Sequence, residues 1–324
     1  MIGVPNRLED SVSYAFDPEL APAIAMLPHV EIDDIAEARA TINAMLTELG
    51  SADPSGVDVR DELVPGPEGA PDVPVRIYTP HRRTAPAAVY DIHGGGFIIG
   101  SIDIDHAANL QFARELGVVV VSVEYRLAPE HPFPAPLEDC YAGLVWTAKN
   151  ADALGIDPQR IAIHGQSAGG GLAAATALLA RDRGGPALAF QYLGVPEVDD
   201  RLETPSMRQF VDTPVWSRPQ AEFSWDSYLG GPGRRGGADV PVHAAPARAT
   251  DLSGLPPAYI SVMQFDPLRD EGIAYAQGLL AAGIPTELHL FPGTFHGSAI
   301  VQQAAVTQRE VAEAIVVLRR GLGL

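Results

Sequence analysis

Cysteine is nearly absent from this chain of 324 residues, because Cys140 is the only one. A lone cysteine excludes a disulfide framework within the chain. Residues 1–5 lack the basic start and apolar core of a secretory signal peptide, and no apolar run reaches the ~18 residues of a membrane span. We therefore expect a cytoplasmic protein with no membrane insertion.

Positive charge is also scarce. The chain has 22 Lys and Arg residues against 41 Asp and Glu residues, which gives a formal net charge of -19. A field of this sign repels phosphate backbones and anionic lipid, so nucleic-acid binding is not expected. A small neutral molecule is the substrate that fits this charge.

Motifs for metals and nucleotides are missing as well. The chain has no paired cysteines and no His-x-x-x-His spacing, so no metal site is predicted. The glycines that begin at Gly94 do not form a dinucleotide fingerprint, because Gly100 comes one position late and 97–99 opens no helix. No Walker lysine follows a glycine run. We expect neither a metal nor a cofactor.

The chain instead alternates strand and helix signals, as one α/β domain does. Helical patches fill 17–50 and end at Gly50. The strands are expected at 57–63, 73–78, 87–92, 117–123, 160–163, 188–195, 257–263 and 286–291. Further helices are expected at 106–116, 137–149, 172–180, 270–282 and 307–322. The first two strands are predicted to pair antiparallel at a sheet edge, and the later apolar runs suit buried parallel strands.

Ser167 lies at a sharp junction between a strand and a helix. The apolar run 161–163 is followed by Gly165, Ser167 and Gly169, and then by a helical pattern. Gly-x-Ser-x-Gly in this position is typical of a nucleophile elbow, in which a strained turn lifts the serine hydroxyl into a cleft. Composition alone would give this pattern in about one chain in eight, so the interpretation needs partner residues.

A second glycine motif, His-Gly-Gly-Gly-Phe at 93–97, directly follows an expected strand. Composition would produce it in about one chain in a hundred, so it is the more specific signal. Consecutive glycines let backbone N–H groups point into a cleft, which is what acyl transfer needs to stabilise a developing oxyanion.

A hydrolytic serine also needs a base and a carboxylate, which follow it in the order acid, then histidine. His289 lies within the expected strand at 286–291, where a packed or surface position suits it. His296 follows that strand on a loop at 292–297 that is expected to be mobile. His296 is therefore preferred as the base. Asp266 follows the strand at 257–263, at the same edge as the elbow. The weaker carboxylate alternatives are Asp270, Glu271, Asp199 and Asp200.

Together these segments resemble the hormone-sensitive lipase family of α/β-hydrolases, the bacterial family IV esterases. The motifs that carry the resemblance lie at 93–97, 125–130, 165–170, 266–271 and 295–297. The resemblance implies an α/β-hydrolase fold: a mostly parallel eight-stranded sheet flanked by helices, with a helical cap. The implied domains are N-terminal cap helices at 1–50, a catalytic domain at 51–196 and 250–324, and a cap insertion at 197–249.

The resemblance further implies a carboxylesterase for short to medium acyl chains, with Ser167 as nucleophile, His296 as base and Asp266 as its partner. The oxyanion donors would be the N–H groups of Gly95, Gly96 and Ala168. Motif positions that would support them are His93, Gly94, Gly165 and Gly169. The family also implies a homodimer formed through the last strand and helix.

Some details depart from the family or stay open. Gln166 stands where the family commonly has Asp, so we expect altered hydrogen bonding behind the elbow. Ala128-Pro129 and Phe133-Pro134 are candidates for cis peptides. The insertion carries aromatic residues that either line the pocket or pack within the cap, among them Phe210, Trp216 and Phe223.

Three other functions are weighed against the carboxylesterase. An amidase or aryl-acylamide deacetylase would use the same residues, and the sequence does not separate it from an esterase. Plant hormone receptors that resemble this family keep the glycines and the serine but lose the histidine, so His296 argues against a receptor. A lipase for long chains is disfavoured because no broad amphipathic lid helix is evident.

Overall fold

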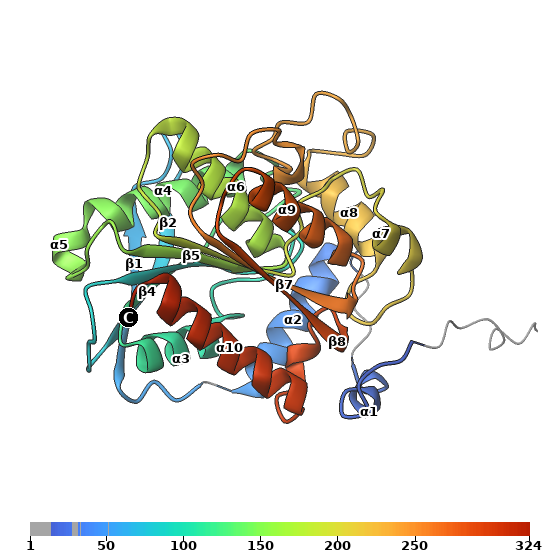
Figure 1. Ribbon diagram of the computed structural model, residues 1–324, viewed down its shortest axis with the longest axis horizontal. Coiled ribbons are helices and arrows are strands. Elements are labelled where there is room, and N and C mark those ends of the chain that lie inside the picture. The colour runs from blue at the N-terminus through green and yellow to red at the C-terminus, as the bar shows by residue number, and fades with distance from the viewer. Residues whose placement is uncertain (1–13, 28–31, 33, 51) are drawn as a thin grey trace, which may run out of the picture.

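The structure is a computed structural model that describes residues 14–27, 32, 34–50 and 52–324. Residues 1–5, where no signal peptide is expected, lie outside the described residues, as do parts of the expected cap region 1–50. A twisted sheet forms the centre of the molecule, with helices on both faces (Figure 1). The strands are β1 Val57–Val64, β2 Val73–Pro80, β3 Ala88–Ile92, β4 Val119–Val123, β5 Ile161–Gln166, β6 Phe190–Gly194, β7 Ala258–Phe265 and β8 Thr286–Phe295.

The described strands form one eight-stranded sheet in the order β1-β2-β4-β3-β5-β6-β7-β8. β1 pairs antiparallel with β2 at the edge, with Val57 opposite Pro80 and Val64 opposite Val73. β2 is antiparallel to β4, and every later pair is parallel. The predicted edge hairpin and the mostly parallel eight-stranded sheet are both confirmed.

Helices cover the two faces of the sheet unequally. α4, α6 and α9 lie on one face, and α3 and α10 lie on the other (Figure 1). The helices are α1 Ala21–Ile24, α2 Ile35–Leu49, α3 His106–Leu116, α4 Ala135–Lys149, α5 Ala151–Leu154, α6 Ala168–Arg183, α7 Pro205–Gln209, α8 Arg218–Tyr228, α9 Arg269–Ala281 and α10 Ala305–Gly321. Among the described residues, none of these helices has the length and apolar character needed to cross a membrane.

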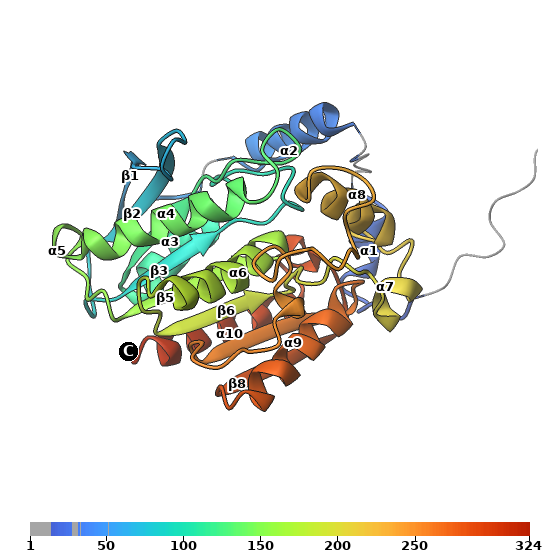
Figure 2. The same cartoon turned by 90° about the horizontal axis from the view of Figure 1, so that it is seen from above.

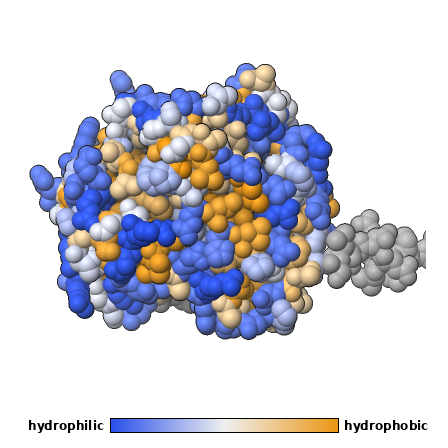
Figure 3. Space-filling model, in the orientation of Figure 1, coloured by the Kyte–Doolittle hydropathy of each residue, from blue (hydrophilic) through white to orange (hydrophobic). Residues whose placement is uncertain are grey.

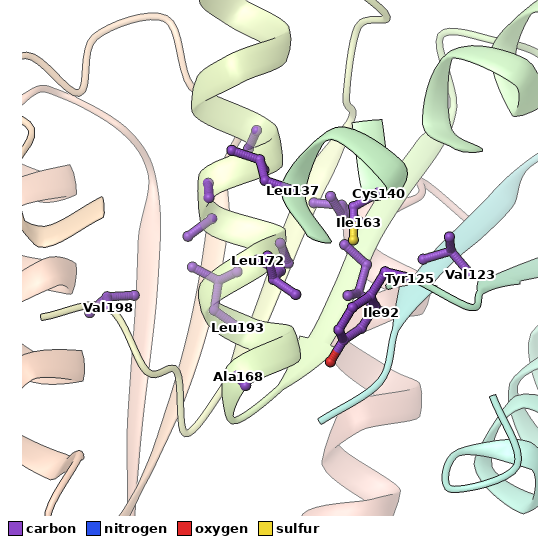
Figure 4. Packing of buried hydrophobic residues seen from close by; sticks show 14 of the residues in the cluster. Ile92, Val123, Tyr125, Leu137, Cys140, Ile163, Ala168, Leu172, Leu193 and Val198 are labelled. Carbon is purple, nitrogen blue, oxygen red and sulfur yellow. The ribbon is translucent and has the colours of Figure 1, made fainter. Parts of the chain in front are cut away.

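The central strands are buried on both faces, which explains why their sequences are nearly continuous apolar runs. On the face covered by α6, side chains such as Ile92, Ile163 and Leu193 pack against Leu172 of that helix (Figure 4). α6 begins with small residues, Ala168 to Gly171, so its first turn can lie close to the strands. The core therefore fixes the junction between β5 and α6.

The remaining helices gather at one end of the sheet. Both views place α1, α2, α7 and α8 there (Figures 1 and 2). α2 is attached by Arg39, which donates to the carbonyl oxygens of Ile98 and Ala128 and pairs with Glu130. Nearby, the two peptide bonds that were candidates for the cis form, before Pro129 and before Pro134, are both cis.

The end of β8 differs from the sequence expectation. Residues 292–295 were expected to form a loop, but they extend β8 as far as Phe295. Phe265 of β7 pairs with Phe295 across a register irregularity, and the side chain of Gln264 accepts a hydrogen bond from the Gly293 N–H. A proline and a glycine in sequence indicate a turn, but here the neighbouring strand absorbs the irregularity. His296 therefore follows a strand and not a mobile loop.

One surface face carries a group of exposed apolar side chains. Leu288 and Leu290 lie on β8, whose outer edge has no strand partner among the described residues, and Val311 and Val316 lie on α10. Figure 3 shows hydrophobic residues gathered on the face of the molecule where β8 and α10 lie.

Candidate active site

Ser167 occupies the single residue between β5 and α6. Its backbone has φ 58° and ψ -125°, a conformation that is strained for a residue with a side chain. The Ser167 N–H donates to the Gly194 carbonyl oxygen at 2.8 Å, which ties the turn to β6. The local structure is thus the sharp strand-to-helix turn that the sequence predicts.

The glycines on either side of Ser167 are required because there is no room for a side chain at these positions. A Cβ atom on Gly165 would overlap the backbone of Gly169. A Cβ atom on Gly169 would overlap the carbonyl oxygens of Ile92 and His93, where β3 ends. Glycine at both positions lets the first turn of α6 lie directly against the sheet.

Gly169→Ala is expected to destabilise the protein by about 1–3 kcal/mol, because the new methyl group meets backbone atoms that cannot rotate away. Gly278→Ala is the matched control, since Gly278 is also helical and a Cβ there meets only the end of the Leu252 side chain. Urea unfolding of both variants measures the difference. Equal stabilities of the two variants would contradict this steric account.

His296 joins Ser167 to Asp266. Its Nε2 atom lies 2.9 Å from the Ser167 Oγ atom, and its Nδ1 atom lies 2.7 Å from Asp266 Oδ2. The other carboxylate oxygen of Asp266 accepts the Leu268 N–H at 2.9 Å. Ser167 is 8% exposed, His296 is 6% exposed and Asp266 is fully buried. The arrangement can withdraw a proton from a serine hydroxyl in a site with little water.

The alternative residues have other partners. His289 pairs with Glu313 on α10 through Nδ1 at 2.5 Å. Asp270 binds Arg269 and accepts the Ser206 N–H, and Glu271 accepts the N–H groups of Val198 and Asp199. Asp199 pairs with Arg201, and Asp200 pairs with Arg248. The structure thus brings together Ser167, Asp266 and His296, and it places the other candidates elsewhere.

The loop at 93–97 lies beside the serine. A Cβ atom on Gly94 would lie 3.5 Å from the Ser167 Cβ. Gly95 and Gly96 have φ values of 121° and 55°, so the loop turns where glycine is favoured. Within the described structure, the N–H groups of Gly95, Gly96 and Ala168 donate to no protein acceptor. These three donors are available to a bound group.

His93 supports this loop from beneath. Its ring stacks on Tyr125 with centroids 4.2 Å apart, and the Tyr125 hydroxyl donates to the His93 carbonyl oxygen at 3.0 Å. Its Nδ1 atom lies 2.8 Å from the Gly94 carbonyl oxygen. Burial lowers the pKa of His93 to about 4, so the ring is neutral at pH 7. We assign His93 to holding the loop in place.

Trp216 from the insertion covers the site. Its ring centroid lies 5.8 Å from that of His296, and a Cβ on Gly96 would come within 2.5 Å of its Cη2 atom. The other two aromatic candidates lie differently. Phe210 packs with Tyr14 and Phe265, and Phe223 packs against the core.

Gln166, the departure from the family pattern, lies behind the elbow. Its side chain is half-buried and fills the space next to Gly194, where a Cβ atom would overlap its Oε1 atom. Within the described structure its side-chain amide forms no hydrogen bond to another protein group.

The sequence did not predict two polar residues that lie near the loop at 93–97. Ser224 of α8 donates to the Gly96 carbonyl oxygen at 2.8 Å and lies 3.2 Å from Glu197 Oε1. The one available signal is that Glu197 closely follows β6, at the same edge as Ser167 and Asp266. Nothing in the pattern around Ser224 distinguishes it from a residue that faces solvent.

Comparison with known proteins gives consistent matches. Residues 89–300 match the family described as alpha/beta hydrolase fold. Carboxylesterase NlhH of Mycobacterium tuberculosis is 44% identical over 239 residues, which cover 73% of this chain and 74% of that protein. Esterase LipI of the same species is 39% identical over 292 residues, covering 87% and 88%. The solved structure of a bacterial heroin esterase is 54% identical, with a TM-score of 0.93 over 95% of this chain and 98% of that one.

Proposed function

Because this chain belongs to the hormone-sensitive lipase family of α/β-hydrolases and is a carboxylic ester hydrolase, we propose that it acts through a Ser167–His296–Asp266 acyl-enzyme mechanism. The observation that carries the proposal is the continuous chain of hydrogen bonds. It runs from Ser167 Oγ through both ring nitrogens of His296 to Asp266.

In the first half of the reaction, Ser167 Oγ attacks the ester carbonyl carbon while His296 Nε2 takes the hydroxyl proton. Asp266 holds the ring in the tautomer that accepts this proton. The N–H groups of Gly95, Gly96 and Ala168 stabilise the oxyanion, and each donor contributes about 10²–10³ in rate. The tetrahedral intermediate collapses, and the leaving alcohol takes the proton from His296.

In the second half, water replaces the alcohol. His296 withdraws a proton from water, whose oxygen attacks the acyl carbon on Ser167. The second tetrahedral intermediate releases the carboxylic acid, and Ser167 Oγ recovers its proton from His296. The chain's own side chains and backbone supply every proton transfer and every oxyanion contact in this cycle.

The same mechanism would serve acyl groups of any length, so the preference for short to medium chains needs its own argument. Trp216 lies against both Gly96 and His296, next to the proposed oxyanion donors and the base, and the serine is almost enclosed. Bulk at this position limits the length of chain that fits. The solved relative named as a heroin esterase supports an ester over an amide as the substrate.

A series of p-nitrophenyl esters from acetate to laurate, run beside p-nitroacetanilide, tests this preference. We expect kcat/KM to peak at acetate to hexanoate and to fall at least about tenfold by laurate, because each misplaced methylene costs binding energy. Trp216→Ala should move the peak to longer chains, whereas Trp146→Ala, on α4, should not. A laurate optimum in the unmodified protein, or faster cleavage of the anilide, would contradict the proposal.

A further inference from the structure

Glu197 is a buried carboxyl group next to the proposed oxyanion loop. It begins the insertion, and its N–H donates to the Ser167 carbonyl oxygen at 3.1 Å. Its Oε1 atom lies 3.2 Å from Ser224 Oγ, which itself donates to the Gly96 carbonyl oxygen at 2.8 Å. Its Oε2 atom is buried with no partner in the described structure. One residue thus contacts the serine turn and, through Ser224, the glycine loop.

The count of hydrogen atoms decides the direction of these bonds. A serine hydroxyl carries one proton and can donate it once. The Gly96 carbonyl can only accept, and it is the closer of the two acceptors, at 2.8 Å against 3.2 Å for Glu197, so the Ser224 proton is placed there. The contact between Ser224 and Glu197 is then a hydrogen bond only if the carboxyl group is protonated and donates to Ser224 Oγ.

The surroundings favour the protonated carboxyl. The ionisable groups that face Glu197 are Asp266 after β7, Glu271 on α9 and Tyr228 on α8. No cationic side chain in the described part of the chain forms an ion pair with it. Burial, with a smaller contribution from the charge of Asp266, raises the pKa of Glu197 to about 8.

α8 holds the glycine loop by packing as well as by hydrogen bonding. Phe97 stacks on Tyr228 with ring centroids 4.1 Å apart and contacts Trp225 with centroids 5.4 Å apart. Ser224, Trp225 and Tyr228 lie on one side of α8, so the same helical face carries both kinds of contact. The position of Gly96 therefore depends on this helix.

We propose that Glu197, as a neutral acid, is a positioning residue that holds Ser224 as the donor to Gly96 and thereby orients the oxyanion loop. The inference rests on the proposed function, because it concerns the donors of that same reaction. Glu197 touches no reacting atom and acts through Ser224.

Ionisation of Glu197 should weaken catalysis. A carboxylate is a stronger acceptor than a carbonyl, so the Ser224 proton turns toward it and the Gly96 carbonyl loses its donor. The protonated form of Glu197 prevails below its pKa of about 8, and it gives way to the carboxylate as the pH rises through that value. We therefore expect kcat to fall on the alkaline side while KM changes little.

Substitutions at Glu197 and Ser224 test the proposal by pH–rate profiles. Glu197→Gln keeps a donor to Ser224 without a titrating group, so kcat at pH 7 should stay within about threefold and the alkaline fall should disappear. Glu197→Ala and Ser224→Ala should lower kcat by about 10–100-fold at pH 7, with less effect on KM, and the gap to the unmodified protein should narrow above pH 8. Glu310→Gln is the control: Glu310 on α10 also has a pKa raised by burial, to about 7, and its variant should keep the alkaline fall.

The outcomes separate this inference from the mechanism beneath it. An alkaline fall in Glu197→Gln equal to that of the unmodified protein would overturn the inference, as would kcat values for Glu197→Gln as low as those for Glu197→Ala. Circular dichroism establishes whether each variant is folded. If Glu197→Ala does not fold, Ser224→Ala tests the same hydrogen bond to Gly96. Failure of the proposed mechanism would appear separately, as turnover that survives in Ser167→Ala.

Discussion

Ser167→Ala is expected to lower the turnover of p-nitrophenyl butyrate by about 10⁶-fold, to the level left by binding and oxyanion contacts alone. Among the described residues, the hydroxyl is the one protein group in hydrogen-bond contact with His296 Nε2, so none of them offers another nucleophile at this nitrogen. The loss should appear in kcat, and KM should change much less. Initial rates at high enzyme concentration measure the residual activity.

Ser261→Ala is the matched control for this variant. Ser261 is buried in β7, and in the described structure its hydroxyl forms no hydrogen bond with the triad, so removing it should leave turnover within a few-fold of the unmodified protein. His296→Ala should lower turnover as much as Ser167→Ala does. The double variant should lower it little further, because the two groups act as one unit. Independent, additive losses would contradict that account.

Asp266→Asn is expected to lower kcat by about 10⁴-fold with little change in the fold. The amide has the shape of the carboxylate, but its NH₂ group opposite His296 Nδ1 would favour the wrong tautomer of the ring. The Leu268 N–H can still donate to the remaining oxygen. The effect should therefore be catalytic, and thermal unfolding should shift much less than activity does.

Asp270→Asn provides the comparison for Asp266. Asp270 lies four residues away and binds Arg269 and Ser206, and not His296. Its amide variant should keep activity within about tenfold, because it changes packing between α7 and α9 and leaves the triad intact. If Asp270→Asn lost more activity than Asp266→Asn, Asp266 would not be the carboxylate partner of His296.

The serine turn could be predicted because its signal is local. A side chain on Gly165 or Gly169 would overlap backbone atoms, either within the turn or at the end of the neighbouring strand β3. The five residues 165–169 are therefore enough to predict the turn. The buried parallel strands were also predictable, since burial on both faces leaves an apolar run that is visible in sequence. The helix at His106–Leu116 was predicted with the bounds that the structure gives it.

The interactions that depend on distant pairing could not be predicted in the same way. The extension of β8 depends on Phe265 of β7 and on the Gln264 side chain, and nothing within 292–295 indicates either. The contact of Trp216 with Gly96, and the link from Glu197 through Ser224, depend on how the insertion folds back over the loop. Composition places aromatic residues in the insertion, but only the fold selects Trp216 among them.

Covalent labelling tests the identity of the nucleophile most directly. Diethyl p-nitrophenyl phosphate, which phosphorylates an activated serine, should modify one residue per chain, and peptide mapping by mass spectrometry should place the adduct on Ser167. His296→Ala should be labelled far more slowly than the unmodified protein. Loss of activity with the adduct on another residue, or with no adduct at all, would contradict the assignment of Ser167 as the nucleophile.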